Sequence, residues 1–107
     1  MATSNSDGSQ TATVTTEHTL ATITDAGTYV LLVDTVNMEL ADKLVLRAKT
    51  KVRSTGTTRL AYEAKYEHVQ SQLVKISIPI ASVNEIVFTL EQTEGTGRAY
   101  PWEIVSL

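Results

Sequence analysis

The sequence predicts an all-β domain, a two-sheet β-sandwich that is jelly-roll-like, with about seven or eight antiparallel strands. Short runs in which apolar and polar side chains alternate indicate strands, because successive side chains of a strand point to opposite faces. Turn-forming residues separate these runs, and no apolar pattern of helical period is long enough for a core helix. A chain of 107 residues is sufficient for one such domain.

The N-terminal segment differs from the rest of the chain in composition. Residues 1–10, MATSNSDGSQ, hold almost nothing that could be buried, so they predict a flexible arm before a single β-sandwich domain over residues 11–107. From Thr11 onward Thr and Val are frequent, and β-branched residues favour the pleated surface of a sheet. The first strands are therefore expected near residues 11–16 and 19–23.

A strand with two apolar faces follows the turn at residues 25–27. Residues 28–36 are apolar on both sides over residues 29–33, which is typical of a strand that is covered on both faces. Pro79 cannot donate a hydrogen bond within a sheet, so it marks the end of a later strand or a sheet edge. The remaining strands outside the central hairpin are expected over residues 73–78, 85–93 and 98–107.

The two segments with the cleanest alternation, residues 43–53 and 59–68, predict a hairpin around Gly56. Val52 and Leu60 can face the same side in paired positions only when an odd number of residues separates them. The expected loop is therefore three or five residues long, and Gly56 is expected to adopt a positive φ within it.

Composition and charge exclude several classes of partner and site. The net charge is -3, with 9 Lys and Arg against 12 Asp and Glu, so no nucleic-acid partner is expected. No apolar run approaches the length of a membrane span, and the first residues lack the features of a secretory signal, so no membrane partner is expected. Without cysteine there is no disulfide or thiolate site, and a reducing compartment suits the chain.

No catalytic, cofactor or metal site is predicted, so we expect a protein that is not an enzyme. His18 and His68 have no companion ligands nearby in the sequence, and residues 94–98, EGTGR, lack the Lys-Ser/Thr of a phosphate loop, which favours a hairpin turn. Glu63 and Glu67 share one strand face with basic residues, which is typical of a solvated, charge-balanced surface and not of a glycosidase pair.

Aromatic side chains leave a further alternative open. Tyr62, Tyr66, Tyr100 and Trp102 lie on the apolar sides of their predicted strands, which favours a role in the core. Their rings are nevertheless of the kind that stacks on sugars. A small carbohydrate-binding module therefore stays an alternative function.

Two features point to interaction surfaces. Basic residues gather on one face of residues 43–53, where they are either neutralised by Glu63 and Glu67 or available to an acidic protein surface. The surplus apolar character of residues 29–33 and 73–80 suggests a subunit interface. The predicted interface residues are Val30, Leu32, Val45, Arg47, Lys49, Lys51, Arg53, Val74 and Ile76, and Lys43 belongs to the same basic face.

Several segments taken together resemble small virion proteins of tailed bacteriophages. These segments are TLATITDAGTYVLLVD, LVLRAKTKV, RLAYEAKY and EQTEGTGRAYPWEI, with Trp102 following the Gly-Thr-Gly-Arg turn. The resemblance implies a capsid cement or decoration protein without an active site, a homo-oligomer, with a trimer favoured, that binds the major capsid protein. It also implies a place on the capsid surface of the virion after synthesis in the host cytoplasm. A tail, neck or fibre-associated β-domain is the alternative within the same class.

Overall fold

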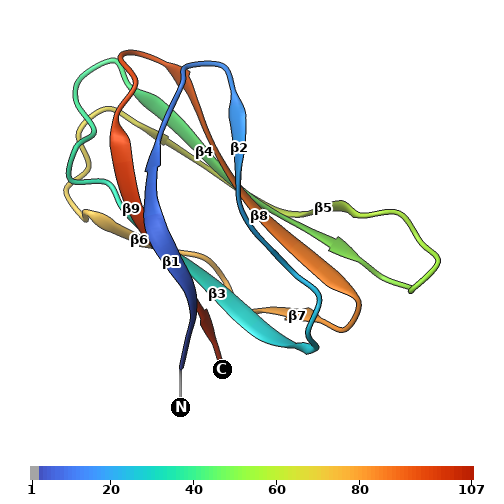
Figure 1. Ribbon diagram of the computed structural model, residues 1–107. Coiled ribbons are helices and arrows are strands. Elements are labelled where there is room, and N and C mark those ends of the chain that lie inside the picture. Colours follow the sequence, from blue (N-terminus) through green and yellow to red (C-terminus); the bar gives the residue numbers. More distant parts are fainter. Residues whose placement is uncertain (1–2) are drawn as a thin grey trace.

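The computed structural model describes residues 3–107, which form two antiparallel β-sheets packed face to face (Figure 1). This arrangement confirms the predicted all-β sandwich, and residues 3–107 contain no helix long or apolar enough to cross a membrane. The strands are β1 (Thr3–Thr11), β2 (Glu17–Ile23), β3 (Gly27–Asp34), β4 (Lys43–Lys51), β5 (Arg59–Glu67), β6 (Val74–Ile76), β7 (Ile80–Ser82), β8 (Glu85–Glu94) and β9 (Ala99–Ser106).

The strand order is that of a long hairpin rolled into a sandwich. The first sheet has the order β1-β9-β3-β6, with β7 also paired to β3, and the second has the order β2-β8-β4-β5. Going outward from the β4–β5 hairpin, β3 pairs with β6 and β7, β2 pairs with β8, and β1 pairs with β9. Counting β6 and β7 as one interrupted edge strand gives a double-sheet jelly roll, as the sequence predicted.

The interruption between β6 and β7 has a local cause. Leu31 of β3 accepts the N–H of Ser77 at its carbonyl (2.9 Å) and donates its own N–H to the Ser77 hydroxyl (2.9 Å). The hydroxyl thus takes the place of a backbone carbonyl, and Pro79 has no N–H to continue the ladder. The chain resumes pairing at Ile80, so the predicted strand end at Pro79 lies between two short edge strands.

The core is formed by alternate residues of the central strands. Inward side chains from both sheets are almost fully buried, and their alternation follows the period of two expected for strands. At the edge between β5 and β6, Lys75 Nζ lies 4.9 Å from the centroid of the Tyr66 ring. The main core residues of the central strands are Tyr29, Leu31, Val33, Leu44, Leu46, Ala48, Ile86, Phe88, Leu90, Tyr100 and Ile104.

The predicted flexible arm is wrong for residues 3–10, while residues 1 and 2 lie outside the described part of the chain. Strand β1 pairs with β9 from Thr3 opposite Ser106 to Thr11 opposite Ala99, with one bulge. Most of its side chains are exposed, so the pairing relies on backbone hydrogen bonds to β9 and not on burial. Of the strand expected near residues 11–16, residue 11 ends β1 and residues 12–16 form a loop that follows it.

The predicted hairpin loop is also wrong. Strand β4 ends at Lys51 and β5 begins at Arg59, so the loop spans residues 52–58. Within residues 3–107, Gly56 is not among the positive-φ positions. The register shifts by a bulge in β5, because Ala48 pairs with Tyr62 and the adjacent Lys49 pairs with Leu60.

The length of this hairpin is set by a neighbouring strand. β4 pairs with β8 as far as Lys51 opposite Glu85, and the Asn84 side chain donates to the carbonyls of Lys51 (3.3 Å) and Val52 (3.1 Å). These bonds hold the base of the loop, while the tip extends beyond the body of the sandwich (Figure 1).

Candidate functional site

The predicted interface residues do not form one surface. Because Tyr29, Leu31 and Val33 face the core, the alternating residues Val30 and Leu32 lie on the outer face of the first sheet. The predicted basic residues belong to the second sheet, so they lie on a different surface from Val30 and Leu32. By the same alternation, Arg47 and Lys49 lie on the outer face of that sheet. Outer-face residues of the first sheet are Val30, Leu32, Val74 and Ile76, those of the second are Val45, Arg47 and Lys49, and Lys51 and Arg53 lie at the β4–β5 hairpin tip.

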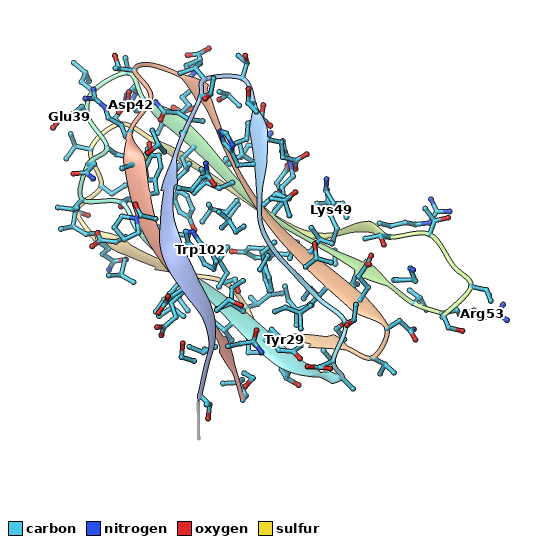
Figure 2. All side chains as sticks on the ribbon, viewed as in Figure 1. Tyr29, Glu39, Asp42, Lys49, Arg53 and Trp102 are labelled. Atoms are coloured by element: carbon cyan, nitrogen blue, oxygen red, sulfur yellow. The ribbon has the colours of Figure 1, made fainter. Side chains whose placement is uncertain are left out.

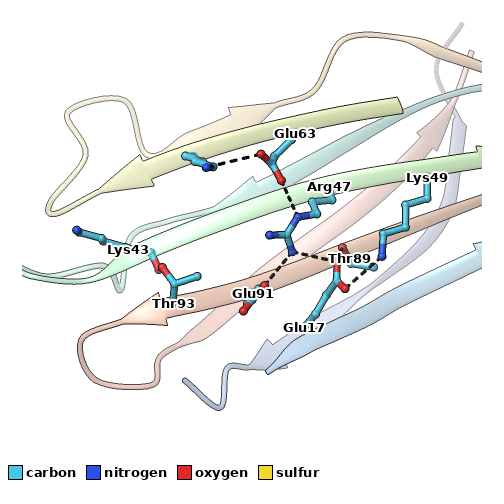
Figure 3. A network of polar contacts seen from close by, with 9 residues as sticks. Glu17, Lys43, Arg47, Lys49, Glu63, Thr89, Glu91 and Thr93 are labelled. Atoms are coloured by element: carbon cyan, nitrogen blue, oxygen red, sulfur yellow. Dashed lines mark hydrogen bonds and ion pairs between the residues drawn. The ribbon is translucent and has the colours of Figure 1, made fainter. Parts of the chain in front are cut away.

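Arg47 is the centre of an ion-pair network on the outer face of the second sheet (Figure 3). Its Nε lies 2.7 Å from a carboxylate oxygen of Glu63, and its Nη1 lies 2.8 Å from Glu91 and 3.1 Å from Glu17. Lys49 Nζ lies 3.2 Å from the other oxygen of Glu17. Four strands, β2, β8, β4 and β5, therefore meet at one guanidinium group.

The network changes the protonation equilibria of its members. The hydrogen bonds that Arg47 donates to Glu91 and Glu63 raise the pKa of Arg47, and the Arg47 guanidinium lowers the pKa of Glu63. Burial alone would raise the pKa of Glu17, but hydrogen bonds from Thr89, Lys49 and Arg47 outweigh it and lower that pKa. Arg47, Glu63 and Glu17 are therefore charged at neutral pH.

The basic face predicted on β4 is therefore largely compensated by the chain itself. Besides Arg47 and Lys49, Lys43 Nζ lies 3.2 Å from Glu94 and 3.9 Å from Glu67. The sequence left open whether the basic residues are neutralised by glutamates or available to an acidic protein surface. Lys43, Arg47 and Lys49 are neutralised by neighbouring glutamates. Sequence reasoning missed Glu17 and Glu91, because their strands become neighbours of β4 only through the jelly-roll topology.

The hairpin tip, defined here as Lys51, Val52, Arg53, Arg59 and Leu60, is different. Within residues 3–107, its three basic side chains take part in no ion pair. Val52 is 88% exposed and Leu60 is 53% exposed. Figure 2 shows Arg53 at the outermost end of the hairpin, directed into solvent. The tip thus combines three basic side chains outside any ion pair with exposed apolar surface, although Glu85 of β8 lies opposite Lys51.

A groove on the outer face of the first sheet, named the sheet groove, has the opposite charge. Its volume is about 280 Å³, just below the usual range of small-molecule sites, so it suits a few side chains of a partner. Ile76, which pairs with Leu32 and is 60% exposed, extends the apolar surface next to it. The groove is lined by Leu32, Val33, Asp34, Val74, Pro101, Trp102 and Glu103.

A third exposed apolar surface, the loop-end patch, consists of Val36, Leu40, Val69 and Leu73. These side chains are between 41% and 77% exposed. They come from the loops at residues 35–42 and 68–73. Sequence reasoning missed this patch, because single apolar residues in polar loops give no periodic signal.

Hydrogen bonds hold the two loops of this patch together. The Thr35 N–H donates to the Leu73 carbonyl (2.8 Å), and the His68 N–H donates to the Asp42 carbonyl (2.7 Å). The Ala41 N–H donates to Nδ1 of His68 (2.9 Å). These three hydrogen bonds thus join the two loops to each other.

A buried carboxylate lies behind the loop-end patch. The Asp42 side chain is fully buried and accepts the N–H groups of Glu39 (2.9 Å) and Thr96 (3.1 Å) and Nε of Arg98 (2.9 Å). Burial alone would raise the pKa of Asp42, but these three donors outweigh it and lower the pKa. Gly95 has φ +94 and lies against Asp42, where a Cβ atom would overlap the carboxylate.

This arrangement explains the Gly-Thr-Gly turn as structural. Gln92 is also fully buried, and its amide donates to the carbonyls of Glu94 (3.0 Å) and Thr96 (2.6 Å). Its side-chain oxygen accepts the hydroxyl of Tyr100 (3.0 Å). Burial raises the pKa of Tyr100 to about 12. The EGTGR segment is thus a turn that carries the chain from β8 of the second sheet to β9 of the first. The predicted hairpin is wrong here, because these two strands belong to different sheets and do not pair.

The remaining candidates of the sequence have local structural partners. Nε2 of His18 accepts the Thr13 N–H (3.0 Å), and within residues 3–107 no group of three or more His, Cys, Asp or Glu is placed to hold a metal ion. Tyr100 is fully buried in the core, as predicted. Tyr62, Tyr66 and Trp102 are partly buried and pack against the core.

Comparison with known proteins identifies no family for this sequence. The chain matches no protein-family model, no curated protein and no solved structure. Its function must therefore be argued from the hairpin tip, the sheet groove and the loop-end patch, together with the resemblance of its sequence segments.

Proposed function

We propose that this protein is a non-enzymatic structural part of a tailed-phage virion, a capsid cement or decoration protein. It binds the outer surface of the shell and stabilises contacts between capsomers. The observation that carries the proposal is the loop-end patch, whose four aliphatic side chains are exposed on two loops already fixed by hydrogen bonds.

A fixed apolar patch is well suited to binding a large surface. Binding usually costs free energy because side chains and loops become ordered, and a preorganised patch avoids much of this cost. Burial of apolar surface then stabilises the complex by about 25 cal/mol for each Å². The partner in this proposal is the major capsid protein, with the loop-end patch as the contact.

Repetition of the contact supports the same proposal. A homo-oligomer, with a trimer favoured, presents several loop-end patches to one shell, so that a modest contact becomes strong through multivalency. The double-sheet jelly roll is an architecture that occurs in viral capsid proteins and also in lectins, and it is therefore compatible with this role.

Co-sedimentation with expanded empty shells of the major capsid protein tests the proposal. The wild-type protein is expected to sediment with the shells, and the Leu40→Ser/Val69→Ser variant is expected to bind at least about tenfold more weakly. Val83→Ser is the matched control, since Val83 is 74% exposed but lies between β7 and β8. Wild-type protein that stays in the supernatant would contradict the proposed function.

Copy number in purified virions distinguishes the alternatives within the class. A decoration protein is present in hundreds of copies, whereas a tail, neck or fibre-associated domain is present in a few to a dozen. Binding of the isolated protein to a glycan array, abolished by Trp102→Ala in a variant that still folds, would favour the carbohydrate-binding module instead.

A further inference from the structure

We infer that copies of this chain associate head to tail, with the hairpin tip of one copy seated in the sheet groove of the next. This inference specifies how the homo-oligomer of the proposed function is assembled. It rests on the proposed self-association of the chain and not on binding to the shell. The occupant of the groove is a second copy, and the argument comes from charge, apolar surface and position.

Uncompensated charges of opposite sign are concentrated at the two sites. The tip carries Lys51, Arg53 and Arg59, and the groove carries Asp34 and Glu103. Within residues 3–107 none of these five groups takes part in an ion pair, although Lys43, Arg47 and Lys49 of the same β4 strand are all paired. These five charges remain unpaired within one chain, and a second chain can neutralise them.

The acidic groups of the groove face outward and have only neutral partners. Asp34 accepts the Val36 N–H (3.0 Å), and Glu103 accepts the Ser4 hydroxyl (3.3 Å). Asp7 of β1 lies directly opposite Glu103 and so shares its face. A third carboxylate thus adds to the negative field beside the groove.

The apolar surfaces of the two sites also correspond. Val52 is 88% exposed at the tip, which is unfavourable for a valine in water. The groove offers Leu32, Val74 and Pro101, and its volume of about 280 Å³ suits a few side chains of a loop but not a whole domain. A small apolar insertion surrounded by opposite charges matches the usual pattern of an apolar interface core with a polar rim.

Position prevents a chain from filling its own groove. Arg53 lies at the outermost end of the β4–β5 hairpin, and Trp102 of the groove lies on the body of the sandwich (Figure 2). The contact joins two different surfaces, so it is heterologous, and each copy uses one tip and one groove. Such contacts produce a closed ring when the rotation between copies closes, and the proposed trimer is a ring of this kind.

Charge reversal tests the contact with the isolated chain. Light scattering at about 100 µM protein in low salt is expected to give a mass that is a multiple of 11.7 kDa. Arg53→Glu/Arg59→Glu reverses the tip and Asp7→Lys/Glu103→Lys reverses the groove, and each variant is expected to weaken association at least about tenfold. The variant that combines all four substitutions is expected to associate again, because both signs are exchanged.

Two controls reverse a single charge of the same sign at other positions, which is half the change of charge in each double variant. Lys65→Glu lies on β5 away from the tip, and Glu39→Lys lies in the loop at residues 35–42, so both should associate like the wild type. Circular dichroism shows whether each variant folds. If Arg53→Glu/Arg59→Glu does not fold, the neutral variant Arg53→Gln/Arg59→Gln is measured in its place.

The possible outcomes are separable. A wild-type monomer, a mass that neither reversal changes, or a folded combined variant that stays dissociated would each overturn the inference. An oligomer that ignores both reversals would leave the homo-oligomer standing with another interface. Shell binding is measured independently with the loop-end variants, so its failure is distinguishable from failure of the head-to-tail contact.

Discussion

Polar residues have opposite roles at the hairpin tip and at the loop end, which is the end of the sandwich that holds the loop-end patch, Asp42 and the turn at residues 94–98. At the loop end, the buried Asp42 carboxylate has three donors, and the fully buried Gln92 amide has partners at both its nitrogen and its oxygen. At the hairpin tip, Lys51, Arg53 and Arg59 have no ion-pair partner within residues 3–107.

The difference indicates which residues maintain the fold and which are available for binding. A polar group that is buried and satisfied stabilises the chain, and its removal leaves other buried groups unpaired. An exposed group without a partner contributes little to stability, so its replacement affects association more than folding. Substitutions in the two regions should therefore separate stability from self-association.

The largest expected effect comes from Asp42→Ala. The substitution leaves the N–H groups of Glu39 and Thr96 and the guanidinium of Arg98 without their acceptor, so the free energy of unfolding should fall by about 3–5 kcal/mol. Denaturant unfolding measures this loss, with the exposed Asp25→Ala as control. A loss below about 1 kcal/mol would mean that the loop end is not held by this carboxylate.

Glycine substitutions compare the two regions directly. Gly95→Ala should lower the free energy of unfolding by about 2–3 kcal/mol, because the position has φ +94 and an added Cβ would overlap Asp42. Gly56→Ala in the loop at residues 52–58 has no positive φ to oppose it and should cost less than about 1 kcal/mol. Equal thermal unfolding midpoints for the two variants would contradict the comparison.

Acid should weaken the loop end. The folded-state pKa of Asp42 is lowered, so as pH falls the unfolded chain takes up this proton before the folded chain does. The stability contributed by Asp42 is therefore complete above its unfolded pKa of about 4 and is lost as pH falls through the folded pKa. Unfolding measured between about pH 5 and pH 2 should show a smaller decrease in Asp42→Asn than in the wild type.

A smaller effect is expected at the centre of the second sheet. Arg47→Met leaves Glu17, Glu63 and Glu91 close together without their shared cation, and should lower the free energy of unfolding by about 1–2 kcal/mol. Arg47→Lys should recover part of this loss because it restores the charge but not the forked geometry. If both variants are as stable as the wild type in denaturant, the network contributes nothing measurable.

The smallest effect on stability is expected at the hairpin tip. Val52→Ser/Arg53→Ala changes two exposed side chains, so the free energy of unfolding should change by less than about 0.5 kcal/mol. The same variant should associate more weakly in sedimentation velocity. A large loss of stability would show that the tip belongs to the fold and would remove the contrast with the loop end.

Much of the fold could be predicted because strand patterns are local. The alternation of residues 43–51 and 59–67 follows from which side chains face the core, and β4 and β5 occupy these positions. β1 gave no such signal, because it carries polar side chains and is held by backbone bonds to β9. The hairpin loop was misjudged because its base is fixed by Asn84, a residue distant in sequence.

The candidate surfaces, like the hairpin loop, depend on residues that are distant in sequence, so local patterns could not predict them. Arg47 was predicted as an interface residue, but its partners Glu17 and Glu91 lie on β2 and β8, which reach β4 only through the rolled topology. Exposure of Leu40 and Val69 depends on how two loops meet, and no periodicity in the sequence reports it.

The sequence by itself determined the class of fold, the position of most strands and the division of their side chains between two faces, because these follow from a repeat of two residues. Only the tertiary structure decided which strands are neighbours, which charges are neutralised within the chain, and which cations and apolar side chains remain exposed. The reason is physical: pairing between strands distant in sequence is set by how both sheets close over one core, and short-range patterns carry no record of that closure.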